Sequence, residues 1–211
     1  MHIYVFGSLC RGEVNLGSDI DALAITERFE PGLDPNMFSI YSYSRIKELW
    51  MEGNPFAWHL AVDARLIFAA DGKDYLKELG VPAPYQRCRE DCLKFSQLYQ
   101  NAFEALSLAD CSLAFELSSI FLAVRNFATC FCLGVKHEKQ FSRHSAKHMG
   151  LESIPLSEGA YWLIERARIL STRGIGPMVT RDELSACFGE IEQIRVWMDR
   201  LFTQIPEHGR I

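Results

Sequence analysis

The stretch FGSLCRGEVNLGSDIDALAIT, residues 6–26, decides the fold of the first part of the chain. Residues 2–6 and 20–25 are rich in β-branched, aromatic and other apolar side chains, so we predict a strand over each. A short helix over residues 8–13 and a turn at residues 15–17 are expected between them. Because side chains alternate along a strand, Asp19 and Asp21 point to the same side.

The residues between these strands are suited to phosphate and metal binding. Gly7 permits a turn that most side chains would obstruct, and Ser8 begins the short helix. A helix N-terminus presents unpaired amides and the positive end of the helix dipole, which favour a phosphate. Two neighbouring carboxylates, Asp19 and Asp21, repel each other unless a cation lies between them. Mg²⁺ prefers oxygen ligands, so we expect it there, completed by phosphate oxygens and water.

Composition limits the class of protein. The chain has 211 residues, 48% of them apolar and 23% charged, which is typical of a globular protein of one large or two small domains. Its seven cysteines are odd in number and scattered, which favours reduced thiols over a disulfide framework, and their spacing matches no zinc site. The first residues read as a strand rather than a targeting segment, so we expect a cytoplasmic protein.

The negative charge is concentrated in the first part of the chain. Residues 1–84 hold seven Lys and Arg against twelve Asp and Glu, whereas residues 85–211 hold fifteen of each. Such an acidic segment argues against broad nucleic-acid binding through a basic face and suits a site that collects cations.

The sequence pattern changes at Pro82-Ala83-Pro84. Before it we predict further strands over residues 37–43 and 58–68, and a helix over residues 44–52 that Gly53-Asn54-Pro55 ends. After it the apolar spacing is helical from residue 88, over residues 112–133 and 157–171, and again towards the C-terminus, where Thr180 and Glu183 form a capping box. We therefore predict an α+β protein: a mixed sheet with helices in residues 1–82 and an antiparallel helical bundle in residues 83–211.

The pattern GSxxRGxxxxxSDID stands complete from Gly7 to Asp21. With it the chain resembles the polymerase-beta-like nucleotidyltransferase superfamily over residues 3–70, particularly its small bacterial and archaeal members and the aminoglycoside nucleotidyltransferases. The resemblance implies Mg²⁺-dependent transfer of a nucleoside monophosphate, AMP from ATP above all, to an acceptor hydroxyl with release of pyrophosphate. The resemblance also implies the role of each motif residue. Gly7 and Ser8 would bind the phosphates, Asp19 and Asp21 would bind one or two Mg²⁺ ions, and Arg11 and Ser18 would contact the nucleotide.

The superfamily also uses a third carboxylate on a neighbouring strand, as metal ligand or as base for the acceptor hydroxyl. In the predicted strand FAWHLAVDARLIF, residues 56–68, His59, Asp63 and Arg65 share one face. An acid in so apolar a strand is expensive to bury without a partner, and a metal would be that partner. Asp63 is therefore the expected third catalytic and metal-binding acid, with Asp71 and Glu48 as weaker alternatives.

The second part of the chain is less informative. The segment over residues 112–133 is apolar enough to suggest a membrane span, but Arg125 and Asn126 in its middle favour the central helix of a bundle. Residues 121–134, FLAVRNFATCFCLG, resemble the Arg-Asn signature of HEPN-type helical bundles. HEPN ribonucleases carry a histidine five to seven positions after that arginine, but residues 130–132 of this chain contain none. We expect Arg125 to be a core arginine bound by Glu116 or by carbonyls at a helix end. The basic run over residues 136–148 is either a solvated loop or a cover for the acidic site.

Three hypotheses remain for the acceptor and the biological role. The acceptor is a small hydroxylated molecule such as an aminoglycoside, or it is a protein or RNA within a toxin–antitoxin pair. In the third hypothesis the chain has lost catalysis and is a nucleotide-binding regulator. We expect no membrane partner, and by analogy with related small enzymes the bundle would form a homodimer or bind a partner chain.

Overall fold

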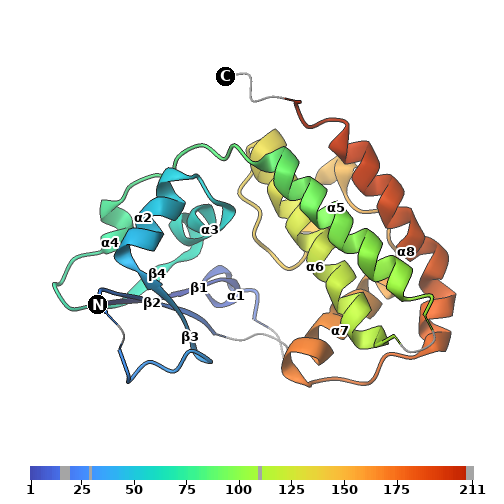
Figure 1. The fold of residues 1–211 in the computed structure, drawn as a ribbon, viewed down its shortest axis with the longest axis horizontal. Coiled ribbons are helices and arrows are strands. Elements are labelled where there is room, and N and C mark those ends of the chain that lie inside the picture. Colours follow the sequence, from blue (N-terminus) through green and yellow to red (C-terminus); the bar gives the residue numbers. More distant parts are fainter. Residues whose placement is uncertain (15–19, 29, 109–110, 208–211) are drawn as a thin grey trace. The chain divides into compact units, whose positions relative to one another are not determined.

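The structure is a computed structural model that describes residues 1–14, 20–28, 30–108 and 111–207. The chain forms two compact units, Met1–Gln86 and Arg87–Ile211, which are described separately. The first contains all four strands of the described residues, and the second is helical (Figure 1).

The first unit is built on a mixed sheet. Its strands are β1 (His2–Phe6), β2 (Asp21–Thr26), β3 (Phe38–Ser42) and β4 (Arg65–Ala69), in the order β3-β2-β1-β4. The central strand β1 pairs antiparallel with both β2 and β4, whereas β2 and β3 are parallel. This is the mixed sheet that the sequence predicts for the first part of the chain.

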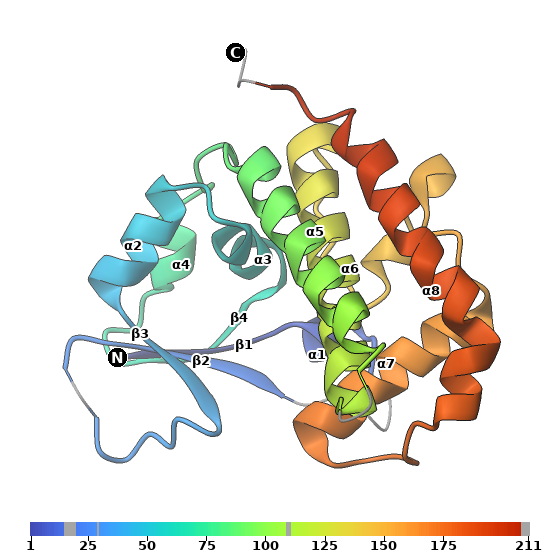
Figure 2. The same ribbon diagram turned by 45° about the vertical axis from the view of Figure 1, so that its right-hand side comes forward.

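Three helices cover one side of this sheet: α2 (Tyr43–Met51), α3 (Pro55–Asp63) and α4 (Tyr75–Glu78) (Figure 2). Alternate strand residues point towards them, as the period of two requires. The buried core therefore joins strand side chains to helix side chains; its members include Tyr4, Phe6, Leu23 and Ile25 from the strands and Ile46, Leu49, Trp50, Leu60 and Leu76 from the helices.

The strand expected over residues 58–68 is wrong in its first half, because helix α3 occupies Pro55–Asp63 and β4 begins only at Arg65. Asn54 caps α3 by accepting a hydrogen bond from the amide of Phe56, and Pro55 fills the first turn, where its missing N–H costs nothing. Gly53-Asn54-Pro55 thus ends one helix and starts the next. Asp63 accordingly lies at the end of a helix, not on a strand.

The second unit contains four long helices: α5 (Cys88–Ala105), α6 (Leu113–Phe131), α7 (Glu158–Arg173) and α8 (Arg181–Phe202). A π-helical turn, Cys132–Lys136, extends α6, and two short 3₁₀ turns, Ser145–Lys147 and Gly150–Glu152, precede α7. The capping box predicted at the start of the last helix is confirmed, because Thr180 and Glu183 each bond the other's backbone amide.

In the described part of the chain one segment, Leu113–Lys136, is long and apolar enough to cross a membrane. Of its most apolar 18 residues, 67% are buried within the structure. A central bundle helix shows such burial, so the segment is weak evidence for a span. Nη2 of Arg125 donates to the carbonyl of Phe141 at 3.4 Å. This carbonyl belongs to the connection between α6 and α7, a partner that the sequence analysis did not name.

Candidate active site

The strand register brings the Gly7 turn and an acidic side chain to one end of the sheet. Phe6, the last residue of β1, pairs with Asp21, the first residue of β2. At the same end, Arg65 at the start of β4 pairs with Val5. The turn after β1, the start of β2 and the residues preceding β4 therefore meet at this end.

Gly7 is required for two separate reasons. Its backbone has φ 75° and ψ −146°, a conformation that L side chains rarely adopt. A Cβ at this position would also overlap Oδ2 of Asp21 and lie 3.2 Å from its Cγ. The carboxylate of Asp21 thus lies directly against the turn. The sequence also predicts Ser18 and Asp19 as site residues of this motif. Both lie outside the residues that the structure describes.

Ser8 begins α1, which is shorter than predicted: it spans only Ser8–Arg11, and Gly12 ends it in the left-handed conformation. The amides of Cys10 and Arg11 both donate to the carbonyl of Gly7. The first amides of a helical turn have no acceptor within it and can face a ligand. The amides of Ser8 and Leu9, which precede those of Cys10 and Arg11, are therefore the ones that can face a ligand, and one turn adds only a small dipole to them.

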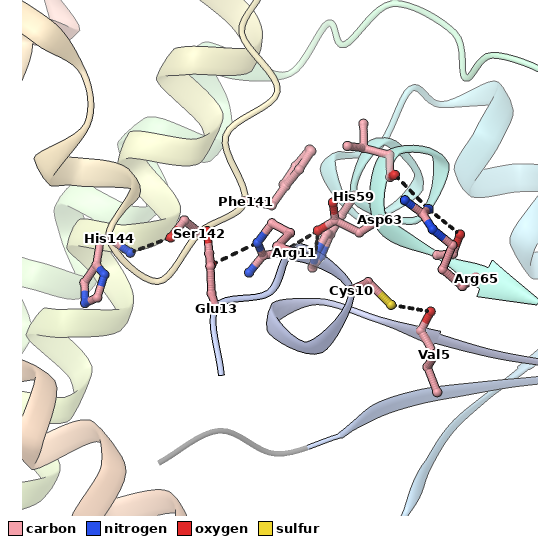
Figure 3. A network of polar contacts seen from close by, with 12 residues as sticks. Val5, Cys10, Arg11, Glu13, His59, Asp63, Arg65, Phe141, Ser142 and His144 are labelled. Atoms are coloured by element: carbon pink, nitrogen blue, oxygen red, sulfur yellow. Dashed lines mark hydrogen bonds and ion pairs between the residues drawn. The ribbon is translucent and has the colours of Figure 1, made fainter. Parts of the chain in front are cut away.

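Asp63 lies at the end of α3 with its side chain 4% exposed, where two basic side chains converge on Oδ2 (Figure 3). Nη1 of Arg11 donates to this oxygen, and Nε2 of His59 lies 3.0 Å from it. Burial by itself raises the pKa of Asp63, but the hydrogen bonds from His59 and Arg11 outweigh burial and hold the pKa below its usual range. Asp63 is therefore a charged, buried and paired carboxylate.

The two weaker alternatives for a third acid lie elsewhere. Asp71 follows β4 at the opposite end of the sheet, where Ala69 pairs with His2. Glu48 is an exposed residue of α2 whose Oε2 accepts a hydrogen bond from Arg45 at 2.9 Å. Neither position shares the end of the sheet at which Gly7 and Asp21 meet.

The site fits a magnesium ion only in part within the described residues. Asp21 supplies a hard oxygen ligand against the Gly7 turn, and the sequence offers Asp19 as its neighbour. Asp63 is already engaged by a guanidinium and an imidazole. Residues 1–14, 20–28, 30–108 and 111–207 contain no group of three His, Cys, Asp or Glu side chains placed to hold a metal. The fit thus rests on Asp21 together with Asp19.

Sequence reasoning missed the contact between Arg11 and Asp63, and it placed His59 on a strand rather than on helix α3. The available signal was local: on a helix beginning at Asn54-Pro55, His59 and Asp63 are four residues apart and share a face. His59 also packs edge-on against Phe6, with ring centroids 5.4 Å apart. The approach of Arg11 from α1 has no local signal, because 52 residues separate it from Asp63.

Comparison with known families agrees with this geometry. Residues 2–81 match the family model described as a nucleotidyltransferase domain, which spans the sheet, helices α1 to α4 and the Gly7 turn. The helical unit lies outside this match, and its resemblance to HEPN-type bundles stays an expectation. Searches of curated proteins and of solved structures gave no significant match. Residues 2–81 of this chain are therefore a nucleotidyltransferase domain, and nucleotidyl transfer is the enzymatic activity that this domain supports.

Proposed function

We propose that the protein transfers AMP from ATP to an acceptor hydroxyl in a magnesium-dependent reaction that releases pyrophosphate. The acceptor oxygen forms a bond to the α-phosphorus, the bond from that phosphorus to the pyrophosphate oxygen breaks, and the hydroxyl proton passes to solvent. Reactions of this type need charge neutralisation and in-line positioning more than covalent participation by the protein.

The chain's own residues divide these tasks. Backbone amides after Gly7 and the hydroxyl of Ser8 bind the β- and γ-phosphates, and Arg11 at the end of the same turn adds a positive charge. Asp21, with Asp19, would hold one or two Mg²⁺ ions, which supply charge neutralisation at the phosphates when bound. Asp63 is assigned no metal in this proposal, because Arg11 and His59 already occupy its Oδ2.

The observation that carries the proposal is the position of the Asp21 carboxylate directly against the Gly7 turn. A ligand carboxylate must lie beside the phosphate-binding turn if one cation is to contact both the protein and the phosphates. The acidic first part of the chain also favours a cationic acceptor, such as an aminoglycoside, over a nucleic acid. Protein and RNA acceptors are the alternatives that the experiment below separates.

The test is incubation of the full chain with each radiolabelled nucleoside triphosphate, Mg²⁺ and a panel of aminoglycosides, proteins and RNAs, scored for pyrophosphate release and label transfer. We expect release with ATP that Asp21→Asn abolishes. Glu48→Gln is the matched control, since it also neutralises an acid of this unit but away from the turn, and it should retain activity. Nucleotide binding without any transfer would favour the regulator hypothesis instead.

A further inference from the structure

The buried carboxylate of Asp63 has contacts that the predicted role of third metal ligand does not explain. One oxygen, Oδ2, receives both Nη1 of Arg11 from α1 and Nε2 of His59 from α3. These two nitrogens are 3.2 Å apart, so both basic groups lie around the same oxygen. Such an arrangement compensates the charge of a buried carboxylate, as a side chain that is 4% exposed requires.

Helix α1 needs an anchor of this kind. It has four residues, none of them buried, so core packing does not fix its end. Arg11 has a long side chain that loses considerable rotamer entropy when it is held in one position. Its Nε also bonds Glu13 at 3.0 Å, but Glu13 is exposed and such contacts contribute little. The buried contact with Asp63 is therefore the one that orients the guanidinium.

We propose that Asp63 is a positioning residue that holds Arg11 towards the triphosphate, rather than a third metal ligand; this rests on the function proposed above. Asp63 and Glu13 engage Nη1 and Nε, so neither of them uses Nη2. In this proposal the two N–H groups of Nη2 donate to a phosphate oxygen, because a guanidinium held in one orientation binds phosphate well. A cation at Oδ2 would have to displace or oppose the guanidinium charge.

Removal of the Asp63 charge separates positioning from metal binding. If Asp63 is a metal ligand, Asp63→Asn raises the Mg²⁺ concentration that nucleotide binding requires. If Asp63 positions Arg11, the same change frees the guanidinium and weakens binding even at saturating Mg²⁺, whereas loss of a negative charge alone would tighten the binding of a polyanionic triphosphate. Loss of one charge-assisted contact is expected to weaken binding about tenfold.

The experiment measures binding of α,β-methylene-ATP, which cannot transfer AMP, to the full chain at saturating Mg²⁺. We expect Asp63→Asn and Arg11→Met each to weaken binding about tenfold, and the double variant to bind no more weakly than Arg11→Met alone. A Mg²⁺ titration at saturating analogue should give the same half-saturating concentration for Asp63→Asn and the native chain. The matched control is Asp71→Asn, which removes another histidine-contacted aspartate of this unit and should leave the affinity unchanged.

Each contrary result has a distinct meaning. A higher half-saturating Mg²⁺ concentration for Asp63→Asn, or additive effects in the double variant, would overturn positioning in favour of metal binding. Unchanged affinity of Asp63→Asn would overturn the inference alone, whereas a native chain that binds no nucleotide would overturn the proposed function as well. If Asp63→Asn fails to fold, Asp63→Glu keeps the charge but moves it by one methylene group; weaker binding supports the inference and unchanged binding overturns it.

Discussion

At one end of the sheet Nε2 of His59 lies 3.0 Å from Asp63, and at the other end Nε2 of His2 lies 3.1 Å from Asp71. The contacts are alike in residue type and distance, but the aspartates differ in surroundings. The side chain of Asp63 is 4% exposed and also receives Arg11, whereas that of Asp71 is 56% exposed. Burial, rather than the histidine contact itself, therefore distinguishes the two ends.

The end with Asp71 has a structural role. His2 is buried, and besides Asp71 it contacts the hydroxyl of Tyr43 at 2.6 Å and the carbonyl of Lys73 at 3.1 Å. These contacts join the start of β1 to the start of α2 and to the loop after β4. The end with Asp63 instead holds charged groups at the end of the sheet where the Gly7 turn lies, which we propose binds phosphate. This difference predicts which substitutions change activity and which change only stability.

The largest expected effect is on catalysis. Asp21→Asn should lower the rate of nucleotidyl transfer by about a thousandfold, since a lost metal ligand removes several kcal/mol of charge stabilisation. His2→Phe, at the other end of the sheet, should leave the rate nearly unchanged. Steady-state pyrophosphate release measures both, and comparable losses in the two variants would show that the two ends are not functionally distinct.

The next effect is on stability. Asp63→Asn should lower the free energy of unfolding by about 3 kcal/mol, because it leaves the Arg11 guanidinium, which is 19% exposed, without its buried partner. Asp71→Asn should leave the urea midpoint almost unchanged, because exposed ion pairs contribute little. Urea unfolding of both variants compares the two ends directly. Equal shifts in midpoint would contradict the distinction drawn from burial.

A smaller loss is expected from His2→Phe, which keeps an aromatic ring in the core but leaves the Tyr43 hydroxyl and the Lys73 carbonyl without this partner. Loss of such buried hydrogen bonds should cost about 1–2 kcal/mol of unfolding free energy. Nucleotide affinity should stay at its native value. A weaker affinity would mean that the end of the sheet with Asp71 is coupled to the Gly7 turn.

The smallest effect is a pH dependence. The pKa of Asp63 is lowered because hydrogen bonds from His59 and Arg11 outweigh burial, and that of Asp71 is lowered first by the amide of Lys73. A lowered folded-state pKa gives stability that is complete above the unfolded pKa, about 3.9, and is lost as pH falls through the folded value. Thermal unfolding below about pH 4 should therefore depend less on pH in Asp63→Asn than in the native chain. Asp71→Asn, at an exposed site, should change that dependence less.

Much of the fold could be predicted because its signals are local. The alternation of apolar residues identified β1, β2 and β3, and the capping residues located the start of α8. The region from Phe56 to Phe68 failed because a continuous apolar run fits a buried helix and a buried strand equally well. Asn54 and Pro55, taken only as the end of α2, were also the start of α3.

The sequence by itself determined the Gly7 turn and the start of the next strand near Asp21, because backbone conformation and side-chain alternation act between residues close in the chain. The class of chemistry followed from the resemblance of its motif to the nucleotidyltransferases. Only the tertiary structure decided what Asp63 contacts, because Arg11 reaches it across 52 residues of sequence. The partner of a buried charge depends on which distant elements the fold brings together, and no short-range pattern records that choice.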